Sequence, residues 1–109
     1  MSPDMTDDGR ECPPAPTFAD GVSRDMQIVN RKGLHARATA KFVQCVERFD
    51  AEVTVTRCGE TVGGVSIMGI LTLGAGIGST ITVSARGAQA QECLDALAEL
   101  VANRFGEEE

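Results

Sequence analysis

The segment Thr80-Ile81-Thr82-Val83-Ser84-Ala85 alternates hydroxyl-bearing residues with apolar ones at every position. A period of two puts Ile81, Val83 and Ala85 on one face of a β-strand and the three hydroxyl groups on the other. Strands that are apolar on one face only are typical of antiparallel sheets that pack one face against a core. The segment therefore predicts a sheet with a single core face.

Segments on both sides of this strand show either the alternation of a strand or the spacing of a helix. Strands are indicated at residues 26–30, 51–56 and 61–65. Apolar residues at helical spacing predict helices over residues 36–49, 66–73 and 88–104. The predicted order is βαββαβα. Three helices cannot cover both faces of so small a sheet and share one core, so we expect an α+β fold. Its four-stranded antiparallel sheet carries the helices on one face and leaves the other, threonine-rich face solvated.

Acidic residues are concentrated at the two ends of the chain. Of the formal net charge of −6, residues 1–25 contribute −4 and residues 107–109 contribute −3, whereas residues 26–106 contribute +1. The prolines all precede residue 17. We therefore expect one domain at 26–106, a flexible acidic N-terminal extension at 1–25 and an acidic C-terminal end at 107–109.

Several classes of function are disfavoured by composition. The near-neutral body has no basic stripe and the chain has no Tyr or Trp, which argues against nucleic-acid binding. No apolar run approaches the roughly 20 residues that span a bilayer, and the first residues are not a secretory signal. We expect a cytoplasmic protein without membrane insertion.

The four cysteines are widely spaced, and the chain has a single histidine. No pair has the C-x-x-C form, so we expect no metal and no cofactor. The cysteines are expected to be reduced thiols, with Cys45 and Cys93 on apolar helix faces.

The single histidine, His35, lies where a strand should end and a helix begin. The free backbone N–H groups of Ala36, Arg37 and Ala38 would form an anion site at the helix N-terminus. Arg37 adds a permanent cation whose fork suits phosphate. Imidazole can act as a covalent nucleophile at neutral pH. With no triad partner apparent, this arrangement favours a carrier over a hydrolase, although a polar surface histidine is the plainer alternative.

Two motifs resemble those of the HPr phosphocarriers. Residues 33–42, GLHARATAKF, resemble the active-site signature, and residues 65–69, VSIMG, resemble the regulatory motif. The separation of the motifs and the βαββαβα order fit as well, so the resemblance covers residues 26–106. It implies an open-faced β-sandwich. Ala38 stands where the family usually has proline, and Val65 where a lysine is common; we expect the helix start to survive and kinase recognition to be altered.

The resemblance implies a phosphocarrier of the phosphotransferase system, which is a substrate of enzymes and not itself an enzyme. His35 would accept a phosphoryl group on Nδ1 from enzyme I, charged by phosphoenolpyruvate, with Arg37 in contact with the group. An EIIA-type domain would then receive it, during sugar transport. The alternative is a regulatory module of the nitrogen-related branch. A small enzyme, such as a phosphohistidine phosphatase, lacks support because no second catalytic group is apparent.

Ser66 precedes the short second helix and suits its N-cap. The resemblance implies that Ser66 is also phosphorylated by an HPr kinase/phosphorylase, which would add about two negative charges beside a docking patch. We expect a monomer whose patch for partner proteins combines residues of two helices, although core positions are the alternative for some of them. The expected patch residues are Ala36, Ala40, Ile67, Met68 and Leu71.

Overall fold

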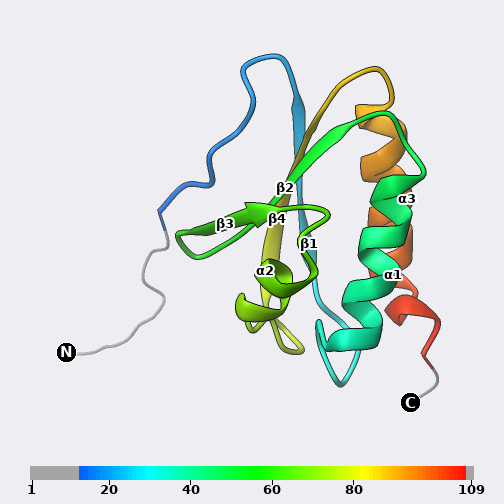
Figure 1. The fold of residues 1–109 in the computed structure, drawn as a ribbon. Coiled ribbons are helices and arrows are strands. Elements are labelled where there is room, and N and C mark those ends of the chain that lie inside the picture. Colours follow the sequence, from blue (N-terminus) through cyan, green and yellow to red (C-terminus); the bar gives the residue numbers. More distant parts are fainter. Residues whose placement is uncertain (1–12, 108–109) are drawn as a thin grey trace.

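A computed structural model describes residues 13–107 of the chain and shows three α-helices and four strands there (Figure 1). The elements are β1 (Val22–Gln27), α1 (Ala36–Glu47), β2 (Glu52–Arg57), β3 (Glu60–Gly63), α2 (Ile67–Thr72), β4 (Thr80–Arg86), α3 (Ala90–Ala102) and the 3-10 turn η1 (Arg104–Gly106). None of the helices in this part is long and apolar enough to cross a membrane.

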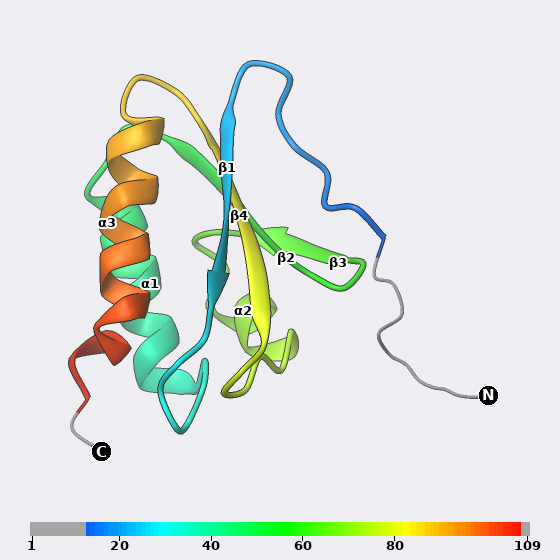
Figure 2. The ribbon, with the colours of Figure 1, turned by 180° about the vertical axis from the view of Figure 1, so that it is seen from behind.

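The strands form one antiparallel sheet in the order β1-β4-β2-β3. The central pair β2 and β4 aligns Val55 with Val83, and α1 and α3 lie side by side over one face (Figure 2). The predicted α+β open-faced sandwich is therefore confirmed. The apolar residues of β4 make its core face: Ile81, Val83 and Ala85 are all fully buried. Phe42 of α1 and Leu97 of α3 are likewise fully buried against the sheet, and each such side chain stabilises the fold by about 1.5–3 kcal/mol.

The first strand begins earlier than the sequence pattern indicated. We expected a strand at 26–30 and an extension up to residue 25, but β1 spans Val22–Gln27 and pairs with β4 from Val22 to Gln27. The extension as predicted is thus wrong for residues 22–25. Only Met26 of this edge strand is buried. An edge strand with exposed polar side chains carries no apolar alternation, so its start could not be found from the sequence. Of the rest of the predicted extension, residues 13–21 are described by the structure, and residues 1–12 lie outside the described part.

The face of the sheet opposite the helices is partly covered, contrary to the expectation that it stays solvated. Residues 13–18 run along it (Figure 2). Ser84 donates from Oγ to the carbonyl oxygen of Pro16 over 3.4 Å, and the guanidinium of Arg86 lies 4.7 Å from the ring centre of Phe18. Because of this cover, Thr56 and Ser84 are buried although they face away from the core.

The cysteines divide into two kinds. Cys45 and Cys93 are free and buried, as expected. Cys58, in the turn between β2 and β3, is disulfide-bonded, so the expectation of reduced thiols is wrong for this residue. Its backbone φ of 45° is uncommon for a residue other than glycine and belongs to the tight hairpin turn.

Candidate functional site

His35 is held at the start of α1 by the loop before it. Gly33 has a φ of +66°, a value that favours glycine, and Leu34 donates its N–H to the carbonyl oxygen of Ala75 over 2.9 Å. His35 is the N-cap of α1 with extended backbone, and its carbonyl oxygen accepts the first helical hydrogen bond from Thr39 over 2.8 Å. The structure thus places His35 where the sequence predicted it.

The backbone N–H groups of the first turn of α1 directly follow this residue. The helix begins at Ala36, so the N–H groups of Ala36, Arg37 and Ala38 belong to the first turn, where no intrahelical acceptor exists. The His35 side chain makes no capping hydrogen bond to these amides within the described part. Ala38 is fully buried, so the helix start is packed in place without the proline common in the family. The three amides and His35 thus lie together at the start of α1, the arrangement on which the predicted anion site depends.

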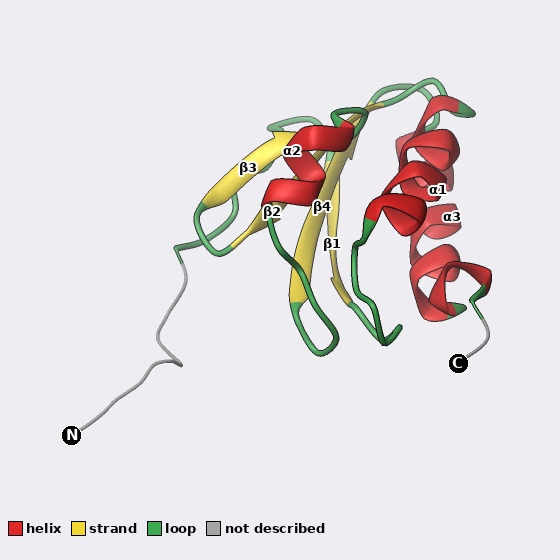
Figure 3. Cartoon of the chain, turned by 60° about the horizontal axis from the view of Figure 1, so that its bottom comes forward, coloured by secondary structure: helices red, strands yellow, loops and turns green. Residues whose placement is uncertain are grey.

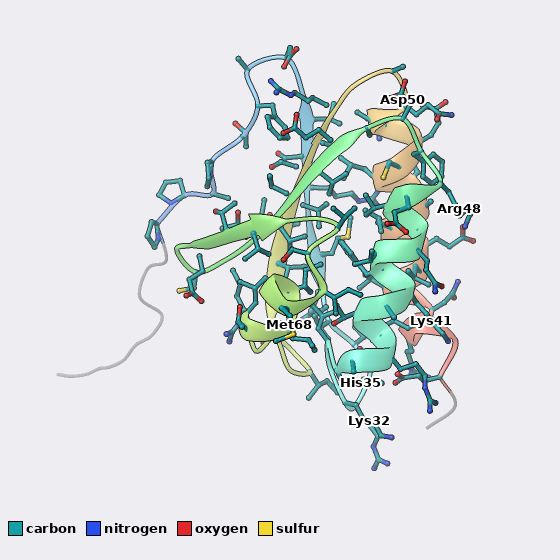
Figure 4. All side chains as sticks on the ribbon, in the orientation of Figure 1. Lys32, His35, Lys41, Arg48, Asp50 and Met68 are labelled. Atoms are coloured by element: carbon teal, nitrogen blue, oxygen red, sulfur yellow. The ribbon has the colours of Figure 1, made fainter. Side chains whose placement is uncertain are left out.

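Basic side chains surround His35. A surface hollow is lined by Arg31, Lys32, His35, Arg37, Lys41, Gly106 and Glu107. Lys32 and His35 lie at the same end of the molecule, and Lys41 lies farther along α1 (Figure 4). Among the described residues, four cations and one carboxylate therefore line the hollow, and their field favours an anion. Of these cations, only Arg37 was predicted as a site residue. Arg31 and Lys32 lie outside both motifs, and Lys41, although it lies within residues 33–42 and one helical turn beyond Arg37, was given no role.

Glu107 is the site residue that sequence reasoning missed. Its Oε2 atom is hydrogen-bonded to Nε2 of His35, and its Oε1 atom accepts from Nδ2 of Asn30 over 3.1 Å. Asn30 is fully buried and also donates to the carbonyl oxygen of Gly33 over 2.8 Å. The hydrogen bond from His35, opposed by burial and assisted by Asn30 and Lys32, holds the pKa of Glu107 below its ordinary value. A charged carboxylate thus lies against the imidazole.

The end of the chain reaches His35 because it turns back after α3. Arg104 and Phe105 adopt φ values of 58° and 56°, and the Phe105 side chain is fully buried. The carbonyl oxygen of Phe105 accepts from Nζ of Lys41 over 2.6 Å. The sequence predicts for residues 107–109 only an acidic end. No local pattern in the sequence signals a contact between residues 72 positions apart.

Ser66 caps α2, as predicted. Its Oγ accepts from the N–H of Gly69 over 3.1 Å, and the side chain is exposed. Figure 3 shows α2 beside the start of α1. Of the predicted docking residues, Ile67 and Met68 are 42% and 70% exposed, which contradicts a core position, whereas Leu71 and Ala40 are half-buried and Ala36 is exposed. Val65, just before α2, and Ile77, in the loop after it, are further exposed apolar residues that were not predicted.

Known proteins match most of the chain. A family model described as "PTS HPr component phosphorylation site" matches residues 22–103. The phosphocarrier protein HPr of Cupriavidus necator is 50% identical over 88 residues, which are 81% of this chain and 99% of that protein. A phosphocarrier protein NPr of Shewanella violacea is 38% identical over 86 residues, 79% of this chain and 94% of that protein. The crystal structure of HPr-C-His from Thermoanaerobacter tengcongensis superposes with a TM-score of 0.77 at 38% identity, covering 81% of this chain and 99% of that one.

Proposed function

The chain belongs to the HPr family of phosphotransferase-system phosphocarriers, and from this premise we propose that His35 carries the phosphoryl group. On this proposal, Nδ1 of His35 accepts the group from phosphorylated enzyme I, and an EIIA-type domain takes it onward. The protein is a phosphocarrier, a substrate of enzymes and not an enzyme itself. We further propose that it acts in the cytoplasm as a monomer.

The observation that carries this proposal is the position of His35 as the N-cap of α1 with its side chain uncommitted to capping within the described part. A phosphoryl group on Nδ1 would carry about two negative charges. The amides of Ala36, Arg37 and Ala38 and the side chain of Arg37 offer donors to those charges. Arg37 is exposed and can follow the group during transfer. The alternative, an ordinary surface histidine, does not account for the ring of cations around the hollow.

Partner proteins would dock on the apolar surface beside the site. Met68, 70% exposed, and Ile67 project from α2, next to the helix that presents His35. Contact there would bring a partner's phosphoryl donor or acceptor to the hollow and exclude water from the transfer. The similarity to an NPr leaves a second function open, that of a regulatory module of the nitrogen-related branch with no role in sugar uptake. The two functions share His35 and Arg37 and differ only in the downstream partner.

The proposed function is tested by intact mass after incubation with enzyme I and phosphoenolpyruvate. We expect the gain of one phosphoryl group, lost again in acid, and no gain for His35→Ala. Arg37→Ala should retain the modification at a reduced rate. A failure of the wild-type protein to gain mass with an enzyme I that phosphorylates another HPr would contradict the proposal. Transfer to a sugar-specific or to a nitrogen-branch EIIA domain then separates the two functions.

Regulation through Ser66 is proposed on the strength of its position. The hydroxyl is exposed at the N-terminus of α2, where a phosphate is compatible with the helix dipole. Phosphorylation would leave the fold intact and place negative charge beside Ile67 and Met68. Incubation with an HPr kinase/phosphorylase and ATP should add an acid-stable phosphate that Ser66→Ala lacks. Val65, in place of a common lysine, should slow this reaction.

A further inference from the structure

Glu107 touches the imidazole on the nitrogen that the proposed transfer does not use. We propose that Glu107 is a positioning residue: its carboxylate holds the proton of His35 on Nε2 and so keeps Nδ1 unprotonated, as a nucleophile. This inference rests on the proposed function, because it concerns which nitrogen of His35 can react. It assigns a role to a residue of the acidic C-terminal end, for which the sequence offered none.

The hydrogen bond between Glu107 and His35 determines which ring nitrogen carries the proton. An ionised carboxylate only accepts, so the ring nitrogen that faces Oε2 must be the donor. In a neutral imidazole one nitrogen carries the proton and the other carries the lone pair. With the proton on Nε2, the lone pair is on Nδ1, which makes no capping hydrogen bond within the described residues.

The carboxylate is itself held in place. Nδ2 of buried Asn30 donates to Oε1 over 3.1 Å, which leaves Oε2 for His35. Asn30 is anchored in turn to the carbonyl oxygen of Gly33 in the loop that presents His35. Only 13% of the Glu107 side chain and 27% of the His35 side chain are exposed. An ordered chain from the loop through Asn30 and Glu107 to Nε2 is therefore built into the fold, as in other sites where a partner group fixes a histidine tautomer.

Transfer then needs no proton movement at His35. The Nδ1 lone pair forms the new N–P bond as the bond between phosphorus and the donor nitrogen of enzyme I breaks, and that electron pair stays on the donor ring. The product ring of His35 bears the phosphoryl group on Nδ1 and the proton on Nε2, so it is cationic and paired with Glu107. In the onward step the N–P electron pair returns to Nδ1, and the neutral ring is restored with its proton still on Nε2.

The test uses the full chain and two readouts. Because His35 is the only histidine, long-range ¹H–¹⁵N correlation spectra show one imidazole, and its two nitrogen shifts give the tautomer. Spectra are recorded above pH 8, where histidine is ordinarily neutral. Steady-state phosphorylation by enzyme I gives kcat and KM. The variants are Glu107→Gln, which is isosteric and can both donate and accept, and Glu107→Ala. Glu47→Ala, at the exposed far end of α1, is the matched control.

We expect the wild-type protein and Glu47→Ala to show the Nε2–H tautomer almost alone. Both Glu107 variants should show a mixture of tautomers and a kcat lower by roughly tenfold, the size of effect expected for one hydrogen bond to a charged group, with KM little changed. Unchanged nitrogen shifts, an unchanged kcat, or a change in KM alone would overturn the proposal. If the wild-type protein accepts no phosphoryl group, the proposed function fails, whereas the nitrogen shifts of the unphosphorylated proteins still decide whether Glu107 sets the tautomer.

Discussion

Leu34 donates its backbone N–H to the carbonyl oxygen of Ala75 over 2.9 Å, which ties the loop before α1 to the loop between α2 and β4. Both residues are almost fully buried. The position of His35, the next residue, therefore depends on a contact between segments that are distant in the sequence. The same contact links α2, whose N-cap is Ser66, to the segment that presents the histidine.

Gly33 makes this contact possible, and its replacement should be costly. At a φ of +66°, a Cβ atom would lie 2.4 Å from the carbonyl oxygen of Ala75. Gly33→Ala should therefore lower the free energy of unfolding by about 2–4 kcal/mol, through the left-handed backbone and the steric clash together. Denaturant unfolding measures this change.

Gly74→Ala is the matched control. Gly74 has nearly the same φ, +65°, but a Cβ atom there would meet nothing within 4 Å. Gly74→Ala should lower the free energy of unfolding by only about 1 kcal/mol, the cost of the backbone conformation alone. Equal losses for the two variants would show that the loops separate freely and that the Leu34–Ala75 contact does not position His35.

The cap of α2 gives a second prediction, about Ser66. Ser66→Ala removes the hydrogen bond from the N–H of Gly69 and should lower the free energy of unfolding by about 1 kcal/mol. Ser66→Asp keeps an oxygen acceptor and adds negative charge at the helix N-terminus, so its stability should stay within about 0.5 kcal/mol of wild type. Thermal unfolding of the two variants measures both effects. A loss for Ser66→Asp as large as that for Ser66→Ala would mean that charge at this position disrupts the helix, so that phosphorylation could not act through docking alone.

The parts of the fold that are predictable from the sequence are those with a local period. Ile81, Val83 and Ala85 alternate with hydroxyl residues, and the structure buries all three on the core face. Ser66 was predicted as an N-cap because its residue type and the following apolar run are sufficient evidence. In contrast, Val22 and its neighbours in β1 are exposed and gain their strand geometry only by pairing with β4, which no local pattern reveals.

The residues of the candidate site also include some that the sequence predicts and some that it does not. His35 and Arg37 could be found because they lie at one helix start, two residues apart. Asn30 and Glu107 could not, because their contact with each other and with His35 depends on the turn at Phe105, where two residues other than glycine adopt left-handed conformations. Tertiary packing stabilises that turn, and the sequence around it reads as the end of a helix followed by an acidic tail.

The buried thiol of Cys93 gives a third prediction, on alkaline pH. Burial, assisted by the nearby Cys45, raises the pKa of Cys93 to about 11. A raised pKa means that the neutral thiol is favoured in the folded state, so its contribution to stability is complete below the unfolded pKa of about 8.5 and is lost as pH rises toward 11. Wild-type stability, followed by denaturant unfolding from pH 8 to pH 11, should therefore fall more steeply than that of Cys93→Ala, whatever their difference at pH 8. Parallel curves would show that Cys93 titrates alike in both states.

The last prediction concerns Phe105, which anchors the turn that brings Glu107 to His35. Its side chain is fully buried, so Phe105→Ala removes core packing and with it the anchor of the chain end, whereas the backbone carbonyl oxygen that accepts from Lys41 is kept. We expect a loss of about 3 kcal/mol in the free energy of unfolding, at the low end for a buried phenylalanine because the chain end can relax into the space. Phe49→Ala, the same change at a half-buried position, should cost less, about 1 kcal/mol. The nitrogen shifts of His35 should also move toward those of Glu107→Gln in Phe105→Ala and stay unchanged in Phe49→Ala. A stable Phe105→Ala variant whose His35 nitrogen shifts equal those of the wild type would mean that Glu107 reaches the imidazole without the turn. Electrostatic attraction and hydrogen bonds from the groups around the carboxylate would then be sufficient.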